Sequence, residues 1–377
     1  MKRLGIVVSH PIQYYSPLFR YLAQTIDLVV FYCHKPNEEE IGASGFGKQF
    51  SWDTDLMSGY SFVFLENVSK KPSLNNFKGC DCPQIGKALE EKRITHVVIL
   101  GWYLKAYIQA LLQARKLNLK VAVRGDSQLN PEEPIYKSML KKLLYPLLLS
   151  RYDKLLYVGQ RNREYLLANG AKPSQLIFSP HAVDQTFWKK DGDIAEQKQN
   201  GKMVFVWIGK FIEKKRPEDA IKAFTEASAL NPDLELWMIG SGNLLEHCRE
   251  LSKAHTSVFF KGFKNQKELK EELKNAHALI LTSDYRETWG LVVNEGFAMG
   301  LPAIVSNSSG CSADLIEEGK TGYLYNVKNT KELRDKIINL AHMLYADARF
   351  FDSGISAKNE TYSYTRNLIS FEEFLNS

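Results

Sequence analysis

Two glutamates in one short segment have the spacing of a binding site for hydroxyl groups. Glu287 and Glu295 stand eight positions apart in the stretch RETWGLVVNEGFAMGLPAIVS. Between them, Gly290 can begin a helix whose first backbone N–H groups are unpaired and can face an anion. Eight positions make a little over two helical turns, so Glu295 can point to the same side as the helix start. One carboxylate near the loop and one deeper in the helix can then accept hydrogen bonds from two sets of hydroxyls. On spacing alone, a solvated helix with acidic residues near its start explains the segment equally well.

Two lysines follow a predicted strand and precede a predicted helix. Lys210 and Lys215 lie in the stretch WIGKFIEKKRPEDAIKAF, after a strand that ends at Gly209 and before a helix that we expect to begin near Pro217. Two ammonium groups near a helix N-terminus form a phosphate site that needs no metal ion. Taken alone, a solvated lysine-rich turn is the simpler interpretation.

A glycine-containing turn follows the next predicted strand. The stretch IGSGNLL, residues 239–245, resembles part of a dinucleotide-binding fingerprint, but Leu245 stands where the third glycine belongs. The following strand also lacks the terminal acidic residue that would bind a ribose, which disfavours a nicotinamide enzyme. Gly240 and Gly242 are instead expected to allow a tight turn close to a ligand.

Strands and helices must position these residues, and the two patterns alternate along the chain. In the front half we predict strands at 4–8, 28–32, 62–65, 96–100, 120–123, 154–158 and 175–179. Helical patterns at 104–116 and 133–149 lie between them, and the alternation restarts with the run MVFVWIG at 203–209. Such alternation predicts parallel sheets covered on both faces, with ligands beyond the carboxyl ends of the strands.

The predicted fold class is α/β, with two doubly wound Rossmann-like domains facing across a cleft. A chain of 377 residues is too long for one ordinary α/β core. We place the N-terminal domain at 1–184, an interdomain linker at 185–202 and the C-terminal domain at 203–355. A helical segment at 356–377 is expected to pack back toward the N-terminal domain.

Charge and cysteine content indicate which partners and which cellular compartment the protein is expected to have. Residues 1–184 hold 24 Lys and Arg against 16 Asp and Glu, and the whole chain has a net charge of +6. A basic front half suits an anionic partner or a membrane surface, whereas nucleic acid is not expected because no nucleic-acid module is recognised. Five cysteines without a C-x-x-C pair, and no apolar run of about 20 residues, predict reduced thiols in a cytoplasmic protein without a membrane span.

From residue 209 to about 325 the sequence resembles the retaining glycosyltransferase family 4, whose fold of two Rossmann domains is called GT-B. The family pattern E-x7-E, with an aromatic-Gly step after the first Glu, is matched by Glu287, Trp289, Gly290 and Glu295. The resemblance implies that Glu287 binds hydroxyls of a donor sugar and that Glu295 binds the ribose of its nucleotide. Backbone amides around Gly290 and Leu291 would then meet the sugar and the phosphate.

The same resemblance assigns the two lysines and Gly262 to the donor site, and three further glycines are candidates for it. Lys210 stands where the family usually has Arg, and Lys215 matches the second basic position, so both are expected to bind the diphosphate. Gly262 matches the position near which the nucleotide base packs. The other donor-site glycines are Gly209, Gly240 and Gly242.

The front half resembles the family more loosely and supplies the candidate acceptor site. Its candidate residues are His10, Gln13, Tyr14, Trp102, Arg124 and Asp126. His10 follows the first strand, where many members carry a glycine-rich loop that this chain lacks, and it can simply cap that strand. Arg124 and Asp126 lie where the family often has a His, and they can orient an acceptor hydroxyl or pair with each other. His10 and Asp126 join Lys210, Lys215 and Glu287 as candidate catalytic residues.

An apolar stretch with basic edges, residues 136–152, allows two interpretations. The favoured one is a buried helix packed on the sheet. The alternative is an interfacial surface that brings the protein to lipid-linked acceptors. Peripheral contact with the inner face of the membrane therefore stays open.

The resemblance implies a hexosyltransferase of polysaccharide biosynthesis that retains anomeric configuration. The expected donor is a UDP-sugar, with a GDP-sugar as the alternative, and the expected acceptor is a glycan or a lipid-linked glycan. No cofactor or metal ion is expected, since Asp53-Thr54-Asp55, a D-x-D sequence, belongs to a different glycosyltransferase architecture. Two alternatives remain: a nucleotide-sugar epimerase of the same fold, and a protein that binds a nucleotide sugar without turning it over.

Overall fold

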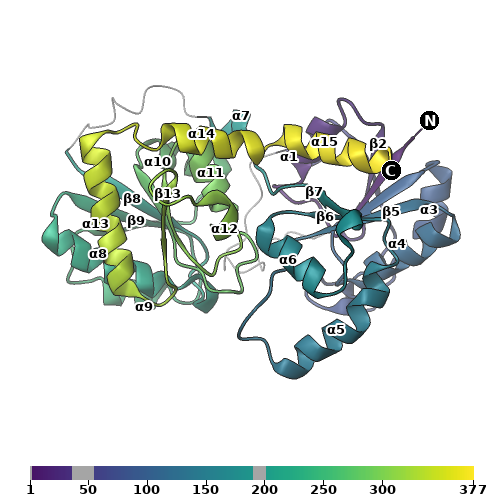
Figure 1. Cartoon of the computed structure of the whole chain (residues 1–377), viewed down its shortest axis with the longest axis horizontal. Helices are drawn as coiled ribbons and strands as arrows, with labels where there is room; N and C mark the ends of the chain where they lie inside the picture. Colours follow the sequence, from purple (N-terminus) through teal and green to yellow (C-terminus); the bar gives the residue numbers. More distant parts are fainter. Residues whose placement is uncertain (1, 36–54, 190–200) are drawn as a thin grey trace. The chain divides into compact units, whose positions relative to one another are not determined.

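The structure is a computed structural model that describes residues 2–35, 55–189 and 201–377 (Figure 1). The described chain forms two compact units. Unit 1 comprises residues 2–35, 55–182 and 363–377, and unit 2 comprises residues 183–189 and 201–362. The predicted linker at 185–202 contains helix α7 (Gln185–Trp188), and its residues 190–200 lie outside the described part of the chain.

Unit 1 contains a sheet of seven parallel strands in the order β3-β2-β1-β4-β5-β6-β7. The strands are β1 (Leu4–Val8), β2 (Leu28–Tyr32), β3 (Ser61–Phe64), β4 (His96–Ile99), β5 (Lys120–Gly125), β6 (Lys154–Tyr157) and β7 (Leu176–Phe178). Every strand predicted for the front half is present, with its ends displaced by two residues at most. The strand order reverses between β1 and β4, so the loops that follow these two strands diverge and leave space for a ligand.

Helices cover both faces of this sheet (Figure 1). One face packs against α1 (Ser16–Leu22) and α15 (Tyr364–Leu375). The other packs against α3 (Ile85–Glu91), α4 (Lys105–Lys116) and α6 (Gln160–Ala168). Because both faces are covered, the central strands are continuous apolar runs, and β1 is buried at every position.

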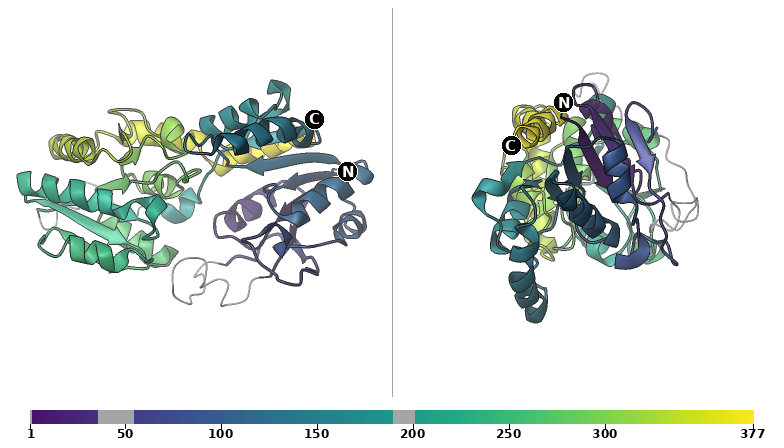
Figure 2. Two further views of the ribbon diagram at one scale, coloured as in Figure 1. Left: turned by 90° about the horizontal axis from the view of Figure 1, so that it is seen from below. Right: turned by 90° about the vertical axis from the view of Figure 1, so that its right-hand side faces the viewer.

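Helix α5 (Ile135–Leu149) differs from the favoured prediction for its segment. The sequence predicts a helix buried on the sheet, but only Leu149 of its 15 residues is buried. Tyr145 and Leu148 pack partly against the core of unit 1, and Figure 2 (right) shows the helix reaching away from the sheet. The prediction is wrong because apolar residues lie on both the packed and the exposed side of this helix, so the sequence does not reveal how much of it meets the core.

Unit 2 contains a sheet of six parallel strands in the order β10-β9-β8-β11-β12-β13. The strands are β8 (Met203–Ile208), β9 (Leu234–Ile239), β10 (Val258–Gly262), β11 (Ala278–Leu281), β12 (Ala303–Ser306) and β13 (Gly322–Tyr325). The order reverses between β8 and β11, which gives unit 2 its own switch point. The two predicted Rossmann-like domains are therefore confirmed.

The helices of unit 2 connect these strands and extend to residue 361. They are α7, α8 (Pro217–Leu230), α9 (Leu245–Leu251), α10 (Gln266–Lys274), α11 (Val292–Ala298), α12 (Ser312–Leu315), α13 (Thr330–Ala346) and α14 (Asp352–Thr361). Helix α8 begins at Pro217, as predicted, since proline is pre-organised for a first helical turn. The C-terminal segment predicted at 356–377 divides between the units, because α14 belongs to unit 2 and α15 to unit 1.

Candidate functional site

A buried ion pair lies at the switch point of unit 2. The Nζ atom of Lys215 contacts the Oε2 atom of Glu287, and the two side chains are 15% and 12% exposed. Lys215 ends a 3-10 helix (η4, Glu213–Lys215) that follows β8, whereas Glu287 lies in the loop after β11. The hydroxyl of Thr282 joins these loops by donating to the backbone oxygen of Lys215 at 2.7 Å. The fold thus brings together two candidate residues that are distant in the sequence.

Positive charge exceeds negative charge around this ion pair. Burial alone would raise the pKa of Glu287, but the charges of Lys215 and Lys214 and hydrogen bonds outweigh it and hold that pKa below its usual value. Burial lowers the pKa of Lys210, and the charges of Lys214 and Lys215 lower it further. We call Lys210, Lys214 and Lys215 the lysine cluster. An anion such as a diphosphate would relieve the repulsion within it.

A network of loop contacts fixes the backbone of Glu287. Its N–H donates to the Asp284 oxygen at 2.9 Å, and its own oxygen accepts from the N–H of Gly310 at 2.9 Å. A Cβ atom on Gly310 would lie 1.8 Å from the Thr288 oxygen, so only glycine permits this approach. Three hydroxyls converge on the backbone oxygen of Ser283, namely those of Ser306, Ser308 and Ser309. Sequence reasoning missed this support, although the run SNSSG, which begins with the last residue of β12, is its signal.

The predicted tight turn at Gly240 and Gly242 is present. Both have positive φ angles, +142° and +152°, that side-chain-bearing residues rarely adopt. A Cβ atom on Gly240 would lie 1.9 Å from the Gly209 oxygen, and one on Gly242 would lie 2.5 Å from the Phe211 oxygen. These glycines therefore let the loop after β9 lie against the loop that carries Lys210. Gly262 ends β10 with φ +70°, and a Cβ atom there would enter open space.

A helix lies in the segment between the two glutamates, as the sequence predicts, but it begins two residues after Gly290 and leaves Glu287 in the preceding loop. Gly290 has φ +108°, and α11 begins at Val292 with Leu291 as its N-cap. Glu295 lies in this helix and is only 3% exposed. Trp289 is buried, its Nε1 donates to the Asn294 side chain at 2.8 Å, and its ring lies 5.9 Å from that of Tyr362. The indole therefore holds the segment in place through packing within unit 2.

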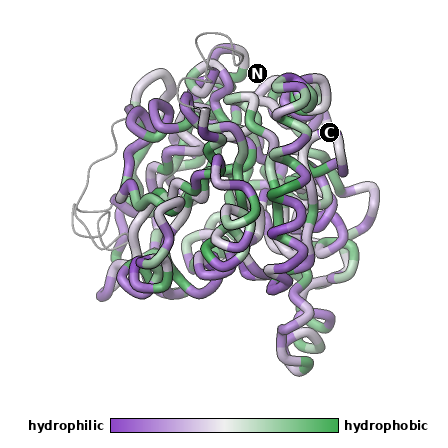
Figure 3. Tube along the Cα trace, turned by 90° about the vertical axis from the view of Figure 1, so that its left-hand side faces the viewer, coloured by the Kyte–Doolittle hydropathy of each residue, from purple (hydrophilic) through white to green (hydrophobic). Residues whose placement is uncertain are grey.

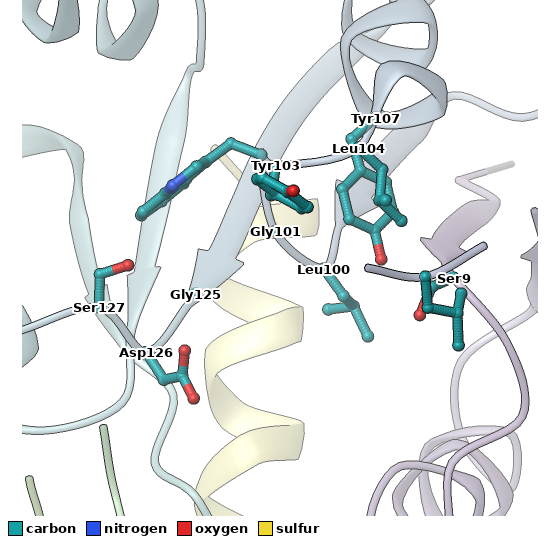
Figure 4. A pocket seen from close by; sticks show the side chains of 11 residues that line it. Ser9, Leu100, Gly101, Tyr103, Leu104, Tyr107, Gly125, Asp126 and Ser127 are labelled. Atoms are coloured by element: carbon teal, nitrogen blue, oxygen red, sulfur yellow. The ribbon is translucent and has the colours of Figure 1, made fainter. Parts of the chain in front are cut away.

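Unit 1 has a cavity of about 250 Å³ at its own switch point. Ser9 after β1, residues 100–104 after β4, and residues 125–127 at the end of β5 and after it contribute to its lining, together with Tyr107 of α4. Figure 4 shows the Asp126 carboxylate directed toward the cavity and the Tyr107 hydroxyl directed toward Ser9. Such a site suits a small ligand that carries hydroxyl groups.

The candidate acceptor residues divide into two groups around this cavity. Trp102 and Asp126 line it, and Trp102 stacks on Tyr165 with ring centroids 6.3 Å apart. His10, Gln13, Tyr14 and Arg124 are not among its lining residues. His10 shares a hydrogen bond of 2.9 Å with Ser9, which does line the cavity.

Arg124, which precedes the lining residue Gly125 in the sequence, has a structural role. Its side chain is buried and donates to the Pro180 oxygen at 2.9 Å and to the Tyr15 hydroxyl at 3.3 Å. It also donates to the backbone oxygen and the hydroxyl of Ser179, at 3.3 Å each. These hydrogen bonds tie the end of β5 to the segment after β7.

Sequence reasoning missed His181, which follows β7. Its Nε2 atom lies 3.7 Å from the Oδ2 atom of Asp126, and its side chain is 8% exposed. Burial lowers the pKa of His181, although the nearby carboxylate of Asp126 acts in the opposite direction. Its imidazole is therefore neutral at neutral pH and can orient the carboxylate of Asp126. The contact depends on strand order, because β5 and β7 are separated by β6 in the sheet.

Residues 2–35, 55–189 and 201–377 contain no group of three or more His, Cys, Asp or Glu that could hold a metal ion. Asp53 and Thr54 of the D-x-D sequence lie outside these residues. In the same part of the chain, no helix is long and apolar enough to cross a membrane. All five cysteines are buried and free of disulfides.

Residues 189–349, most of which belong to unit 2, match the family model described as Glycosyl transferases group 1. The chain is 26% identical over 169 residues to spore coat protein SA of Bacillus subtilis (strain 168), a match that covers 41% of this chain and 45% of that protein. It is 30% identical over 161 residues to N-acetyl-alpha-D-glucosaminyl L-malate synthase of Bacillus anthracis, covering 42% and 40%. The matches thus span less than half the length of these curated relatives.

A solved structure matches the entire chain. The crystal structure of Anabaena HepE in complex with UDP aligns over 100% of both chains, with a TM-score of 0.75 and 13% sequence identity. A sequence identity this low is evidence for a shared fold and for nothing more. Together with the two parallel sheets, it confirms the predicted GT-B fold.

Proposed function

We propose that this chain is a glycosyltransferase that moves a hexosyl unit from a nucleotide diphosphate sugar to a glycan or lipid-linked acceptor. The transfer retains the anomeric configuration and needs no metal ion. The observation that carries this proposal is the buried contact between Lys215 and Glu287 beside Lys210 and Lys214, at the switch point of a Glycosyl transferases group 1 domain.

The charges of the site match the parts of such a donor. The lysine cluster binds the diphosphate and stabilises its charge as it leaves. When the diphosphate binds Lys215, the carboxylate of Glu287 becomes available to accept hydrogen bonds from the sugar and to hold it for attack on the same face. Glu295 binds the ribose, and Gly262 leaves open space where the base packs. Because the lysines supply the positive charge themselves, the proposal includes no metal.

One comparison favours a UDP-sugar as the donor, and a second one favours retention of the anomeric configuration. Anabaena HepE, which has the same fold, is described in complex with UDP. The Bacillus anthracis relative is named for an N-acetyl-alpha-D-glucosaminyl product, and its α configuration is what retention from an α-linked donor produces. A GDP-sugar remains the alternative donor.

The cavity of unit 1 is the proposed acceptor site. Its volume of about 250 Å³ suits one sugar ring, and Trp102 offers an aromatic wall. Asp126 orients the attacking hydroxyl of the acceptor. The buried, neutral imidazole of His181 holds the carboxylate of Asp126 in position. His10 lies beside Ser9 at the same edge of the sheet.

A panel of UDP- and GDP-sugars, each assayed with and without candidate acceptor glycans, tests this function. Acceptor-dependent release of nucleoside diphosphate is expected with at least one donor, and NMR of the product should show the anomeric configuration of the donor. Donor epimerisation without an acceptor would contradict transfer. So would tight donor binding without release of diphosphate in the presence of every acceptor.

A further inference from the structure

Helix α5 exposes an unusual amount of apolar surface for one helix. Seven of its large side chains are between 48% and 79% exposed, namely those of Ile135, Tyr136, Met139, Leu140, Leu143, Leu144 and Leu147. Figure 3 shows hydrophobic residues along this helix, at the lower end of the view. Soluble proteins rarely leave such a continuous apolar surface exposed unless it binds something.

These side chains form one stripe because of their spacing. Positions 135, 139, 143 and 147 make one row of i, i+4 neighbours, and positions 136, 140 and 144 make an adjacent row. The opposite side of the helix carries Tyr145, Leu148 and Leu149, which pack against the core of unit 1. We call the two exposed rows the α5 stripe. The packed side supports the helix, and the stripe faces outward.

Lysines border the α5 stripe along both of its edges. Lys137 lies beside Leu140 and Leu144, and exposed Lys142 lies beside Met139 on the opposite edge. Lys141 lies toward the packed side, where its Nζ atom is 2.5 Å from Glu133. The helix itself, IYKSMLKKLLYPLLL, contains no acidic residue.

We propose that the α5 stripe docks unit 1 onto an anionic membrane surface. Apolar side chains enter the boundary between headgroups and acyl chains, and Lys137 and Lys142 extend toward the lipid phosphates. The charges favour lipid over a second copy of the chain. Two paired α5 helices would bring lysines together without a carboxylate on either helix to compensate them, whereas anionic headgroups supply that compensation.

The position of α5 in the chain connects this surface with the cavity of unit 1. Asp126 lines the cavity, and α5 begins nine residues later, so the chain between them spans at most about 30 Å. Docking would therefore hold the cavity near the lipid headgroups, where a lipid-linked acceptor resides. The docking itself depends on α5 and not on the proposed transfer reaction.

Flotation of the full chain with lipid vesicles tests the proposal. Binding is expected to vesicles of phosphatidylcholine with about one-third phosphatidylglycerol, and it should weaken with phosphatidylcholine alone and with rising salt. The double variant Leu143→Asn/Leu147→Asn should lower the partition coefficient at least about tenfold. Lys137→Ala/Lys142→Ala should lower it about thirtyfold for anionic vesicles only. Leu230→Asn is the matched control, because Leu230 of α8 is 71% exposed and lies in unit 2.

Three results would overturn the proposal. They are failure of the full chain to bind anionic vesicles, unchanged binding of the double leucine variant, and an α5-dependent dimer by light scattering that excludes vesicles. Circular dichroism and thermal unfolding of every variant establish that lost binding is not lost folding. Calorimetry with UDP separates the two proposals. A protein that binds UDP but not vesicles would contradict only the membrane docking, and a protein that binds vesicles but not UDP would contradict only the proposed donor site.

Discussion

The switch points of the two units have the same topology but different chemistry. In unit 2, the loops after β8 and β11 bring together the lysine cluster and Glu287, all of them ionisable. In unit 1, the loops after β1 and β4 line a cavity with Ser9 and Trp102, and α4 adds Tyr107. Asp126 is the only charged lining residue of this cavity among the described residues. Topology therefore determines where a ligand binds, and the loop side chains determine which one. A charged site suits a diphosphate, and a mostly neutral cavity suits sugar hydroxyls.

The largest expected effect comes from removing the carboxylate of the unit 2 site. Glu287→Ala should lower kcat by on the order of 10² or more, because the sugar loses the group that holds it as diphosphate leaves. Affinity for UDP should persist, since Lys215 loses a competing partner. Initial rates with the best donor, and calorimetry with UDP, measure the two effects. Glu213→Ala, an exposed change in the same loop region, should behave as wild type. A near-wild-type rate for Glu287→Ala would refute this role.

A second change tests the unit 1 side of the comparison. Asp126→Asn should lower kcat/KM for the acceptor by about 10- to 100-fold, because the amide cannot accept the proton of the attacking hydroxyl. Affinity for UDP should stay unchanged, since Asp126 belongs to the other unit. Asp27→Asn is a matched control, because Asp27 has similar exposure but precedes β2, at the opposite edge of the sheet. If Asp126→Asn lost UDP affinity and acceptor transfer to the same extent, the assignment of separate donor and acceptor sites to the two units would be contradicted.

A third change sharpens the role of the lysine cluster. Lys210→Ala should weaken UDP binding about tenfold, because one charge–phosphate contact is worth roughly 1.5 kcal/mol after desolvation. Calorimetry measures the affinity, and Lys222→Ala on the exposed face of α8 is the control. Unchanged affinity in Lys210→Ala would place the diphosphate elsewhere.

Local signals were sufficient to predict most elements of the fold. Apolar periodicity and the positions of glycine and proline predicted the strands of unit 1 within two residues and the start of α8 at Pro217. The contact between Lys215 and Glu287 forms because β8 and β11 are neighbours in the sheet. Local signals do not show this, because the strand order depends on the whole sheet. His181 was missed for the same reason. The exposure of α5 was missed because an apolar sequence does not show which face of a helix meets the core.

The smallest expected effect is a pH dependence that only the charged switch point should show. Burial and the other two lysines lower the pKa of Lys210 in the free protein, and a bound diphosphate would raise it toward the usual value. Protonated Lys210 binds the diphosphate better than the neutral amine does. The affinity for UDP should therefore be highest at pH values below the pKa that Lys210 has in the free protein. It should fall a few-fold as the pH rises from that pKa toward the usual pKa of a lysine.

Calorimetry of UDP binding across that alkaline range, in buffers of different ionisation enthalpy, measures both the affinity and the proton uptake. The difference between wild type and Lys210→Ala isolates the contribution of this lysine from titration of the uracil ring. Lys222→Ala should keep the wild-type profile, because Lys222 lies on the exposed face of α8. Identical pH profiles of UDP affinity for wild type and Lys210→Ala would mean that Lys210 does not gain a phosphate partner. The difference in charge between the two switch points would then rest on Lys214, Lys215 and Glu287 alone.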